Sequence, residues 1–598
     1  MTLKHDLYPT TPELARLRAV AAGQEQADLI IRGGLVQSPG TEEWLERDLV
    51  IAGRHIAALT PWGHFPTAAE EIDASGSHVV PGFIDAHLHI EYTNLTPGEL
   101  GRVSVPRGTT TVLTDPNAAA NIWGEDGLGL MLDTTTPLRI LHQVSPTAPA
   151  SDTLERGGKR VPESTVLARL AQDAAVTLGE ANPFDYSEVS TARYREALVN
   201  GRRITGHTAA QTHETLWGYL AAGVGDDHNS VTIDEVLERT RLGAMITVMG
   251  SSLSDNTLTI FSDLDKVAPA LRSLCFCADD KQVTDLVREG HIDHHVRQAI
   301  RLGVDPQLAY RMATTQPAHY YRLDQVVGVL APSRLADVLI IPDLADVRPS
   351  YVLSSGTVVA REGECLFRND DVLPDWARDT MHLPASRDPA ILEAHVDDDR
   401  TEVDVRAMEL YHGYFKRAVT ATLPVIDGSI QADPAQDMLK IAIMDRHHAS
   451  GERGIGFVRG FGLTRGAIAV SMNCMNMNIA VVGTTDADML HAIDALDAMG
   501  GGFVAVADGE TLAAVPLPIG GVMSDAPFEQ TNAALLDAHA AAASLGCPMR
   551  APFIILSFVG MFVVPEIGLT ELGLVDVGAQ AFIDLVLPDD HAASSSHL

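Results

Sequence analysis

Cysteine is scarce in this chain, and its scarcity excludes a disulfide-stabilised fold. Only five cysteines occur among 598 residues, and no two of them form a Cys-X-X-Cys pair. Cys275 and Cys277 are one residue apart, a spacing that suits a strand better than zinc ligation. We therefore expect reduced thiols, which favours a cytoplasmic protein.

Positively charged residues are also few. Lysine and arginine number 43 against 79 aspartates and glutamates, so the formal net charge is −36. A surface of this charge repels nucleic acid and anionic membranes. We therefore expect neither nucleic acid nor a membrane as a partner.

Long hydrophobic runs are missing as well. The most apolar run covers residues 553–564 and is followed by Pro565, so it is too short to span a bilayer. Its composition predicts a buried strand. Residues 1–22 lack the apolar core of a signal peptide, in keeping with a cytoplasmic location.

Aromatic residues are rare, but small and turn-forming residues are plentiful. Aromatics make up 5% of the chain and hydrophobic residues 46%, with 49 glycines and 32 prolines. This composition is typical of an α/β protein with many short connections. A chain of 598 residues is expected to form two or three domains.

The alternation of strand and helix patterns predicts the fold class. Short β-branched runs alternate with helical stretches between residues 81 and 330, with helices near 234–242 and 292–302. Repeated βα units of this length predict a TIM-type (β/α)8 barrel. A further helix is predicted near residues 486–499, in a C-terminal α/β domain.

Changes in pattern set the predicted domain limits. Short antiparallel strand patterns stand on both sides of the barrel and predict one small flanking β-sandwich domain in two parts. A charged, proline-rich stretch predicts a linker before the last domain. The limits are 1–80 and 331–370 for the small β domain, 81–330 for the barrel, 371–400 for the linker and 401–598 for the C-terminal domain.

Two histidines stand at the end of the first barrel strand. The apolar residues 79–84 lead into Asp85-Ala86-His87-Leu88-His89. Residues two apart in a strand face the same side, so the His87 and His89 imidazoles converge. Such a pair at the C-terminal end of a barrel strand indicates a hydrolytic metal site. The alternative is a surface strand that carries two histidines by chance.

Four more candidate ligands each follow a predicted strand. Each residue alone is more often structural, and the evidence is their order and their placement at strand ends. Such a set can hold two divalent ions at the C-terminal mouth of the barrel, with a bridging glutamate and an aspartate beside the water. A register shift of one residue would put Asp280 in the aspartate's place. The four ligands are Glu180, His207, His228 and Asp279.

Several motifs resemble those of the bacterial adenine deaminases, a family of the amidohydrolase superfamily. The resemblance runs from about residue 28 to residue 580, and the C-terminal motifs are peculiar to this family. The matching segments are residues 81–91, 107–111, 206–207, 278–280, 289–293 and 335–338, and in the last domain 446–448, 456–463 and 516–525.

The resemblance implies a reaction and a set of roles. The family converts adenine and water to hypoxanthine and ammonia with a divalent transition metal, typically manganese or iron, and zinc is an alternative. Two ions are expected, held by His87, His89, Glu180, His207, His228 and Asp279. Asp279 also moves protons, and Glu91 is a second predicted catalytic carboxylate. The resemblance further implies a homo-oligomer, a dimer or larger.

The chain departs from the family near the expected substrate. Tyr92-Thr93 replaces Ser-Ser after Glu91, Asp115-Pro116-Asn117-Ala118 replaces Asp-Pro-His-Glu, and His228-Asn229 replaces His-Glu. Residues 473–478, Asn-Cys-Met-Asn-Met-Asn, replace Ala-His-Asp-Ser-His-Asn. The predicted substrate-binding residues are therefore Asn117, Asn229, Asn473, Cys474, Met475 and Asn476.

These departures leave three hypotheses. The first is adenine deamination by the inherited metal site. In the second, the lost acids and imidazoles redirect the same chemistry to another nitrogen heterocycle or cyclic amide. The third is an inactive relative that binds a ligand or a partner subunit.

Other histidines and methionines are predicted to be structural. His291, His294 and His295 lie at a helix start and are expected to face solvent. Met472, Met475 and Met477 are placed on a strand, with core packing as their expected role. The adjacent His447 and His448 would face opposite sides of a strand, which argues against joint ligation.

Overall fold

The computed structural model describes residues 4–38, 40–132, 134–146, 148–172, 175–208, 211–385 and 387–588. The chain divides into two compact units. The first consists of Met1–Pro116, Gly129–Pro146 and Pro162–Val372, and the second of Asn117–Leu128, Thr147–Val161 and Leu373–Leu598. Each unit is described by itself.

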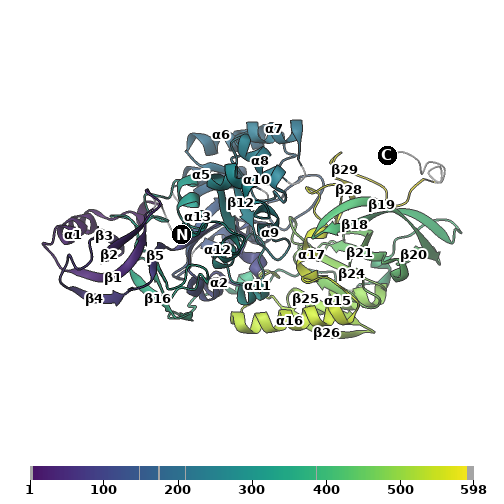
Figure 1. The fold of residues 1–598 in the computed structure, drawn as a ribbon. Helices are drawn as coiled ribbons and strands as arrows, with labels where there is room; N and C mark the ends of the chain where they lie inside the picture. The colour runs from purple at the N-terminus through teal and green to yellow at the C-terminus, as the bar shows by residue number, and fades with distance from the viewer. Residues whose placement is uncertain are drawn as a thin grey trace. The chain divides into compact units, whose positions relative to one another are not determined.

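The first unit contains a nine-stranded sheet built from both sides of the barrel segment. Antiparallel pairing of β14 with β5 joins the two parts, and an apolar cluster that includes Leu29, Val79 and Val338 fills one face. Strands β1 to β5 appear in purple in Figure 1. The strands are β1 (Ala27–Gln37), β2 (Trp44–Ala52), β3 (His55–Thr60), β4 (Ala68–Asp73), β5 (His78–Pro81), β14 (Val338–Ile341), β15 (Tyr351–Ser354), β16 (Thr357–Arg361) and β17 (Glu364–Cys365).

Eight parallel strands among the described residues form the predicted barrel. They fall into two ladders, β6 to β10 and β11 to β13. Parallel bridges between Ile204 and Val224 and between Leu88 and Asp279 close the ladders into a ring. The strands are β6 (Phe83–Leu88), β7 (Thr109–Thr114), β8 (Arg139–Val144), β9 (Ala175–Ala181), β10 (Arg203–Gly206), β11 (Asp226–Asp227), β12 (Met245–Met249) and β13 (Leu274–Cys277).

Burial explains why these short segments become strands. Every residue of β6, β7, β8, β12 and β13 is buried, as expected for parallel strands covered by helices on one face and packed side chains on the other. The (β/α)8 prediction is confirmed. The covering helices include α5 (Glu163–Ala171), α6 (Glu188–Val199), α7 (His213–Ala221), α8 (Ile233–Arg241) and α12 (Ile292–Arg301) (Figure 1).

The helices predicted near 234–242 and 292–302 are confirmed by α8 and α12, but the prediction that His291, His294 and His295 face solvent is wrong. His291 and His295 are completely buried and His294 is 9% exposed. The polar composition suggested a solvent-facing helix start, whereas α12 packs against β6 and β13 and turns these imidazoles inward. His291 Nδ1 lies 2.9 Å from Thr109 Oγ1, and His295 Nδ1 lies 3.1 Å from the His291 carbonyl oxygen.

The second unit is built on another nine-stranded sheet, with a helix on it where the sequence predicted one near 486–499. That helix is α15 (Asp486–Ala498), capped by the Thr485 side chain. The sheet order is β20, β19, β18, β22, β21, β24, β23, β25 and β26. The strands are β18 (Glu402–His412), β19 (Phe415–Ile426), β20 (Ser429–Ile430), β21 (Leu439–Met444), β22 (Arg453–Arg459), β23 (Ala467–Val470), β24 (Ile479–Gly483), β25 (Gly502–Ala507) and β26 (Glu510–Pro516).

Two predictions in the second unit are wrong. Residues 553–564 do not form a strand, because the run begins inside the buried helix α17 (Pro552–Val559). A continuous apolar run fits a buried helix as well as a buried strand, and Pro552 at the first turn favours the helix. Met472, Met475 and Met477 lie in a turn between β23 and β24, where Met475 and Met477 have positive φ.

No helix among the described residues is long and apolar enough to cross a membrane.

Candidate metal centre

The two histidines of the first barrel strand lie at the centre of a polar cluster. His87 is on β6 and His89 follows it, and their ring centroids are 4.8 Å apart. His87 Nδ1 is 2.7 Å from Gln143 Oε1, and His89 Nδ1 is 2.7 Å from the Asp115 carbonyl oxygen. Because each Nδ1 donates to these acceptors, each Nε2 is left as the ligand atom.

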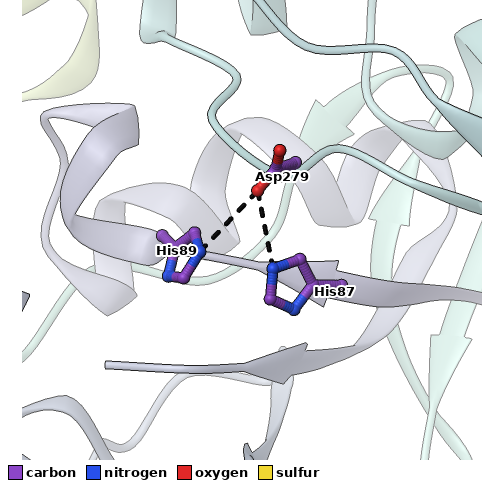
Figure 2. Close-up of side chains that lie close together, drawn as sticks. All are labelled: His87, His89 and Asp279. Carbon is purple, nitrogen blue, oxygen red and sulfur yellow. Dashed lines mark ion pairs between the residues drawn. The ribbon is translucent and has the colours of Figure 1, made fainter. Parts of the chain in front are cut away.

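Asp279 lies opposite the histidine pair (Figure 2). Its Oδ1 is 3.5 Å from His87 Nε2 and 3.7 Å from His89 Nε2. The residue follows β13 and has φ of 51°, a left-handed conformation that costs free energy for a residue with a side chain. Its backbone N–H donates to the His87 carbonyl at 3.0 Å. Pairing at the barrel seam, where the end of β6 meets the residues after β13, therefore holds Asp279 in place.

Glu180 on β9 connects the remaining ligands. Its Oε1 is 3.7 Å from His87 Nε2 and 3.2 Å from His228 Nε2, and its Oε2 is 3.4 Å from His89 Nε2. The Glu180 backbone N–H donates to Asp115 Oδ2 at 3.0 Å. Glu180 therefore faces three imidazoles with two separate oxygens.

His207 and His228 complete the group from the neighbouring strand ends. The His228 ring stacks on His87 with centroids 4.7 Å apart, and the His207 ring lies parallel to His228 at 6.1 Å. All six predicted ligands are thus brought together, and His207, which is half-buried, lies at the edge of the group.

The electrostatics of the cluster favour a cation. Burial disfavours charge on His228, but the Asp279 and Glu180 carboxylates outweigh it and raise the pKa of His228 to about 10. Burial likewise disfavours the Glu180 carboxylate, yet His228 and His89 hold the pKa of Glu180 well below its usual range. Buried carboxylates with this demand for positive charge are suited to bind a metal ion.

The donor atoms are spaced as ligands of one ion would be. His87, His89 and Asp279 form one group, and His87, Glu180 and His228 form another, each with all its ligand atoms within 4.8 Å of one another. Ligands about 2.0–2.2 Å from a common ion in tetrahedral geometry lie about 3.3–3.6 Å apart, close to the separations seen here. The residues present fit a divalent cation.

Two other predicted carboxylates, Asp280 and Glu91, follow ligand residues in the sequence. Asp280 is 4% exposed, and its Oδ1 has no hydrogen-bond partner among the described residues. Burial and the neighbouring Asp279 charge raise the pKa of Asp280 well above its usual value. Glu91 is completely buried on the short 3₁₀ helix η2 (Ile90–Thr93) and belongs to neither ligand group.

The chain matches two family models and has full-length relatives. Residues 78–359 match the amidohydrolase family, and residues 414–581 match the adenine deaminase C-terminal domain. The adenine deaminase of Desulforamulus reducens is 37% identical over 581 residues, covering 96% of this chain and 98% of that protein. The chain belongs to the adenine deaminase family. The adenine deaminase of Bacillus subtilis is 33% identical over 582 residues, covering 95% and 98%.

Membership of the adenine deaminase family confirms the resemblance noted in the sequence. The protein is therefore a hydrolase that acts on carbon–nitrogen bonds. Dependence on a divalent metal is typical of the amidohydrolase superfamily, and the clustered imidazoles and carboxylates agree with it.

The residues that depart from the adenine deaminase pattern are divided between the two units. Asn229 is in the first unit, where it is 8% exposed and its backbone N–H donates to Asp227 Oδ1 at 3.3 Å. Asn117 begins helix α3 (Asn117–Trp123) in the second unit. The segment 473–476 also belongs to the second unit.

The turn that contains residues 473–476 is held by its own polar groups. Asn473 Nδ2 donates to Asn476 Oδ1 at 2.9 Å, and Asn476 Nδ2 donates to Glu571 Oε2 at 2.9 Å. The Cys474 N–H donates to the Ser557 carbonyl, and the Met475 carbonyl accepts from Asn121 Nδ2 at 2.7 Å. Several polar atoms of these four residues are thus engaged within the second unit.

His447 and His448 line a cavity of about 270 Å³ in the second unit, together with Trp123 and Trp376. His447 Nε2 lies 2.9 Å from the Asn476 carbonyl, and His448 Nε2 lies 3.0 Å from the Gly157 carbonyl. Each ring is therefore anchored to a different segment of backbone.

Sequence reasoning missed the residues that orient the ligands. Gln143 on β8 orients His87, and the Asp115 carbonyl orients His89. The buried pair of Asp85 and His291 lies beneath the same strands. A polar residue on a predicted barrel strand, as at Gln143 on β8 and Asp85 on β6, is the signal that would have pointed to them.

Proposed function

We propose that this protein converts adenine and water to hypoxanthine and ammonia at the cluster around His87 and His89. The observation that carries the proposal is the convergence of His87, His89, Glu180, His228 and Asp279 in a member of the adenine deaminase family. Six residues, these five and His207, are proposed to hold two divalent ions, manganese or iron, with zinc as the alternative.

The proposed ligand roles follow from the distances between the ligand atoms. Glu180 presents Oε1 to His87 and His228 and Oε2 to His89, which supports a bridging role between two ions. Gln143 and the Asp115 carbonyl hold the two Nε2 atoms of the histidine pair toward that carboxylate. A bound divalent cation lowers the pKa of water toward neutrality and so supplies the nucleophile for hydrolysis.

Asp279 is proposed to carry the proton. Its carboxylate accepts a proton from the attacking water as the water oxygen bonds to C6 of adenine; the electron pair of the C6–N1 double bond moves to N1, which takes up a second proton. The same carboxyl group then gives its proton to the departing amino group as the C6–N bond breaks. Ammonia leaves, and the C6 hydroxyl loses its proton to become the carbonyl of hypoxanthine. The left-handed backbone at Asp279 keeps Oδ1 within 3.7 Å of both histidines, in reach of the reacting atoms. Glu91 is proposed as a second catalytic carboxylate.

A second candidate substrate follows from the departures at the substrate positions. Amides stand at Asn117 and Asn229 where the family has ionisable side chains, and deamination of an adenine ring requires proton donation to a ring nitrogen. Another nitrogen heterocycle or cyclic amide is the alternative substrate. Asn117, Asn229, Asn473, Cys474, Met475 and Asn476 are the residues proposed to contact the substrate.

The remaining proposals concern the protein as a whole. We propose that the protein forms a homo-oligomer of two or more copies in the cytoplasm. We also propose that its domains have the limits predicted from the sequence. The net charge of −36 supports the expectation that neither nucleic acid nor a membrane is a partner.

The test is ammonia release from adenine by protein loaded with manganese. We expect turnover with manganese and none after treatment with a chelator. A panel of other purines, pterins and hydantoins is assayed in parallel. Hydrolysis of a panel member without adenine turnover would favour the second candidate, and a metal-loaded protein inactive on every compound would contradict both.

A further inference from the structure

His291 immediately precedes helix α12, and its side chain lies inside the barrel wall. Its Nε2 is 2.8 Å from Asp85 Oδ2, and its Nδ1 is 2.9 Å from Thr109 Oγ1. His291 and Asp85 are both completely buried. A buried polar group costs free energy unless it has a partner, and the His291 imidazole stands beside Asp85 Oδ2.

The other oxygen of Asp85 joins the two strands that meet at the barrel seam. Asp85 Oδ1 accepts from the His87 backbone N–H at 3.2 Å and from the Ala278 backbone N–H at 3.1 Å. His87 is a proposed ligand on β6, and Ala278 immediately precedes Asp279. One carboxylate oxygen therefore fixes the backbone on both sides of the proposed metal site.

The seam needs this support because ordinary sheet pairing is minimal there. Between Leu88 and Asp279 the two strands share an isolated bridge rather than a continuous ladder. Asp279 is also in the left-handed region at φ of 51°, a conformation that persists for such a residue only where surrounding contacts impose it. The Asp85 contact to Ala278 acts on the residue directly before this strained position.

The local sequence delivers the imidazole to Asp85. Gly290 has φ of 116°, and a Cβ there would approach Asp293 Oδ1 to 2.4 Å. The same Asp293 oxygen accepts from the His291 N–H at 2.7 Å, and Arg297 Nη2 binds the other oxygen at 2.6 Å. The turn is thus built to start α12 with His291 pointing inward.

We propose that Asp85 and His291 are positioning residues that hold His87 and Asp279 at the spacing a metal ion requires. The inference rests on the proposed function of the His87–His89 site. Neither residue belongs to a ligand group, and both act through the backbone of residues that do. The pair links α12 to the seam, so a change at His291 is transmitted to the metal site.

The experiment compares three substitutions on the full-length protein. His291→Leu removes both ring contacts, and His291→Gln keeps an amide donor near the position of Nε2. His294→Leu is the matched control, because His294 lies on the same helix and is nearly as buried, with its Nε2 3.6 Å from Asp255 Oδ2 and no contact to Asp85. Affinity for manganese alone is measured by equilibrium dialysis of chelator-treated protein, and kcat and KM for adenine are measured after loading.

We expect His291→Leu to weaken manganese binding about 10–100-fold, the effect typical of lost outer-sphere support. At saturating manganese its kcat should fall while KM changes little. His291→Gln should recover most of the affinity, and His294→Leu should stay within about twofold of wild type, below the effect of lost outer-sphere support. If His291→Leu does not fold, Asp85→Asn keeps the side-chain volume and should weaken manganese binding in the same direction.

Two results would overturn the positioning role. One is manganese affinity in His291→Leu, or in Asp85→Asn, equal to that of wild type. The other is an equal loss in His294→Leu, which would mean that any buried histidine of α12 has the same effect. A wild-type protein that binds no manganese and releases no ammonia would instead contradict the proposed function itself.

Discussion

The His87–His89 cluster and the turn at residues 473–478 are both buried and polar, but they satisfy their polar atoms in opposite ways. In the turn, the amide groups of Asn473, Asn476 and Asn478 donate to one another and to Glu571, so these donors have their acceptors within the protein. In the cluster, the imidazole Nε2 atoms and carboxylate oxygens face one another at 3.2–3.7 Å.

The comparison teaches how a binding site differs from a structural polar network. A structural network closes on itself, because a buried polar group without a partner costs free energy. In a metal site, several acceptor atoms point toward one position, and the bound cation supplies the positive charge. The cluster matches the family pattern in sequence and the turn departs from it. Only the contacts in the structure distinguish a metal site from a structural polar network.

The largest effect is expected from Glu180→Gln, which would break the cluster. The substitution removes the charge that three imidazoles share, so manganese content should fall to below half of the wild-type value and ammonia release by at least about 10³-fold. Metal analysis and an ammonia assay check both. The matched change Glu571→Gln, at the carboxylate that accepts from Asn476 and Asn478 of the turn, should leave the manganese content unchanged. Full activity in Glu180→Gln would show that the bridging role is wrong.

A smaller effect is expected from Gln143→Leu, which keeps the volume but removes the acceptor of the His87 Nδ1–H. Manganese affinity should weaken about 10–100-fold, since loss of an orienting hydrogen bond to a ligand histidine has this magnitude. Thr177→Val is the control, because the buried Thr177 hydroxyl has no hydrogen-bond partner among the described residues. Equal affinities in wild type and Gln143→Leu would exclude the orienting role.

The smallest effect concerns pH and the second unit. Burial, with the nearby Glu571 charge, raises the pKa of Glu155 to about 8. An acid whose pKa is raised by folding stabilises the folded state fully below its unfolded pKa of about 4.5, and that stabilisation is lost as pH rises toward 8. The unfolding temperature should therefore fall between pH 5 and 8. This decrease in unfolding temperature should be smaller in Glu155→Gln, because the substituted side chain cannot ionise. In the exposed control Glu510→Gln the decrease should equal that of wild type. Identical pH profiles for all three proteins would refute this account.

Much of the metal centre could be predicted because its ligands follow strand ends. Strand periodicity places His87 and His89 on one side, and a barrel brings the C-terminal ends of distant strands together. Glu180, His207, His228 and Asp279 come close to this pair for that reason. The substrate residues do not follow such a rule, because Asn117 begins helix α3 and residues 473–476 lie in a turn, both in the second unit.

The wrong predictions have a common physical cause. The solvent-facing assignment of His291 and the strand assignment of residues 553–564 both rested on local composition. Local composition does not tell which neighbour covers a segment, and tertiary packing overrides weak local preference.

By itself the sequence determined the barrel, the family and the set of residues available to bind metal, because periodicity and motif order are local properties of the chain. Only the tertiary structure decided that Gln143 orients His87, that Asp85 and His291 lie at the seam, and that residues 473–478 close on Glu571. These contacts join residues that are tens to hundreds of positions apart, and no local pattern encodes the partner of a buried polar atom.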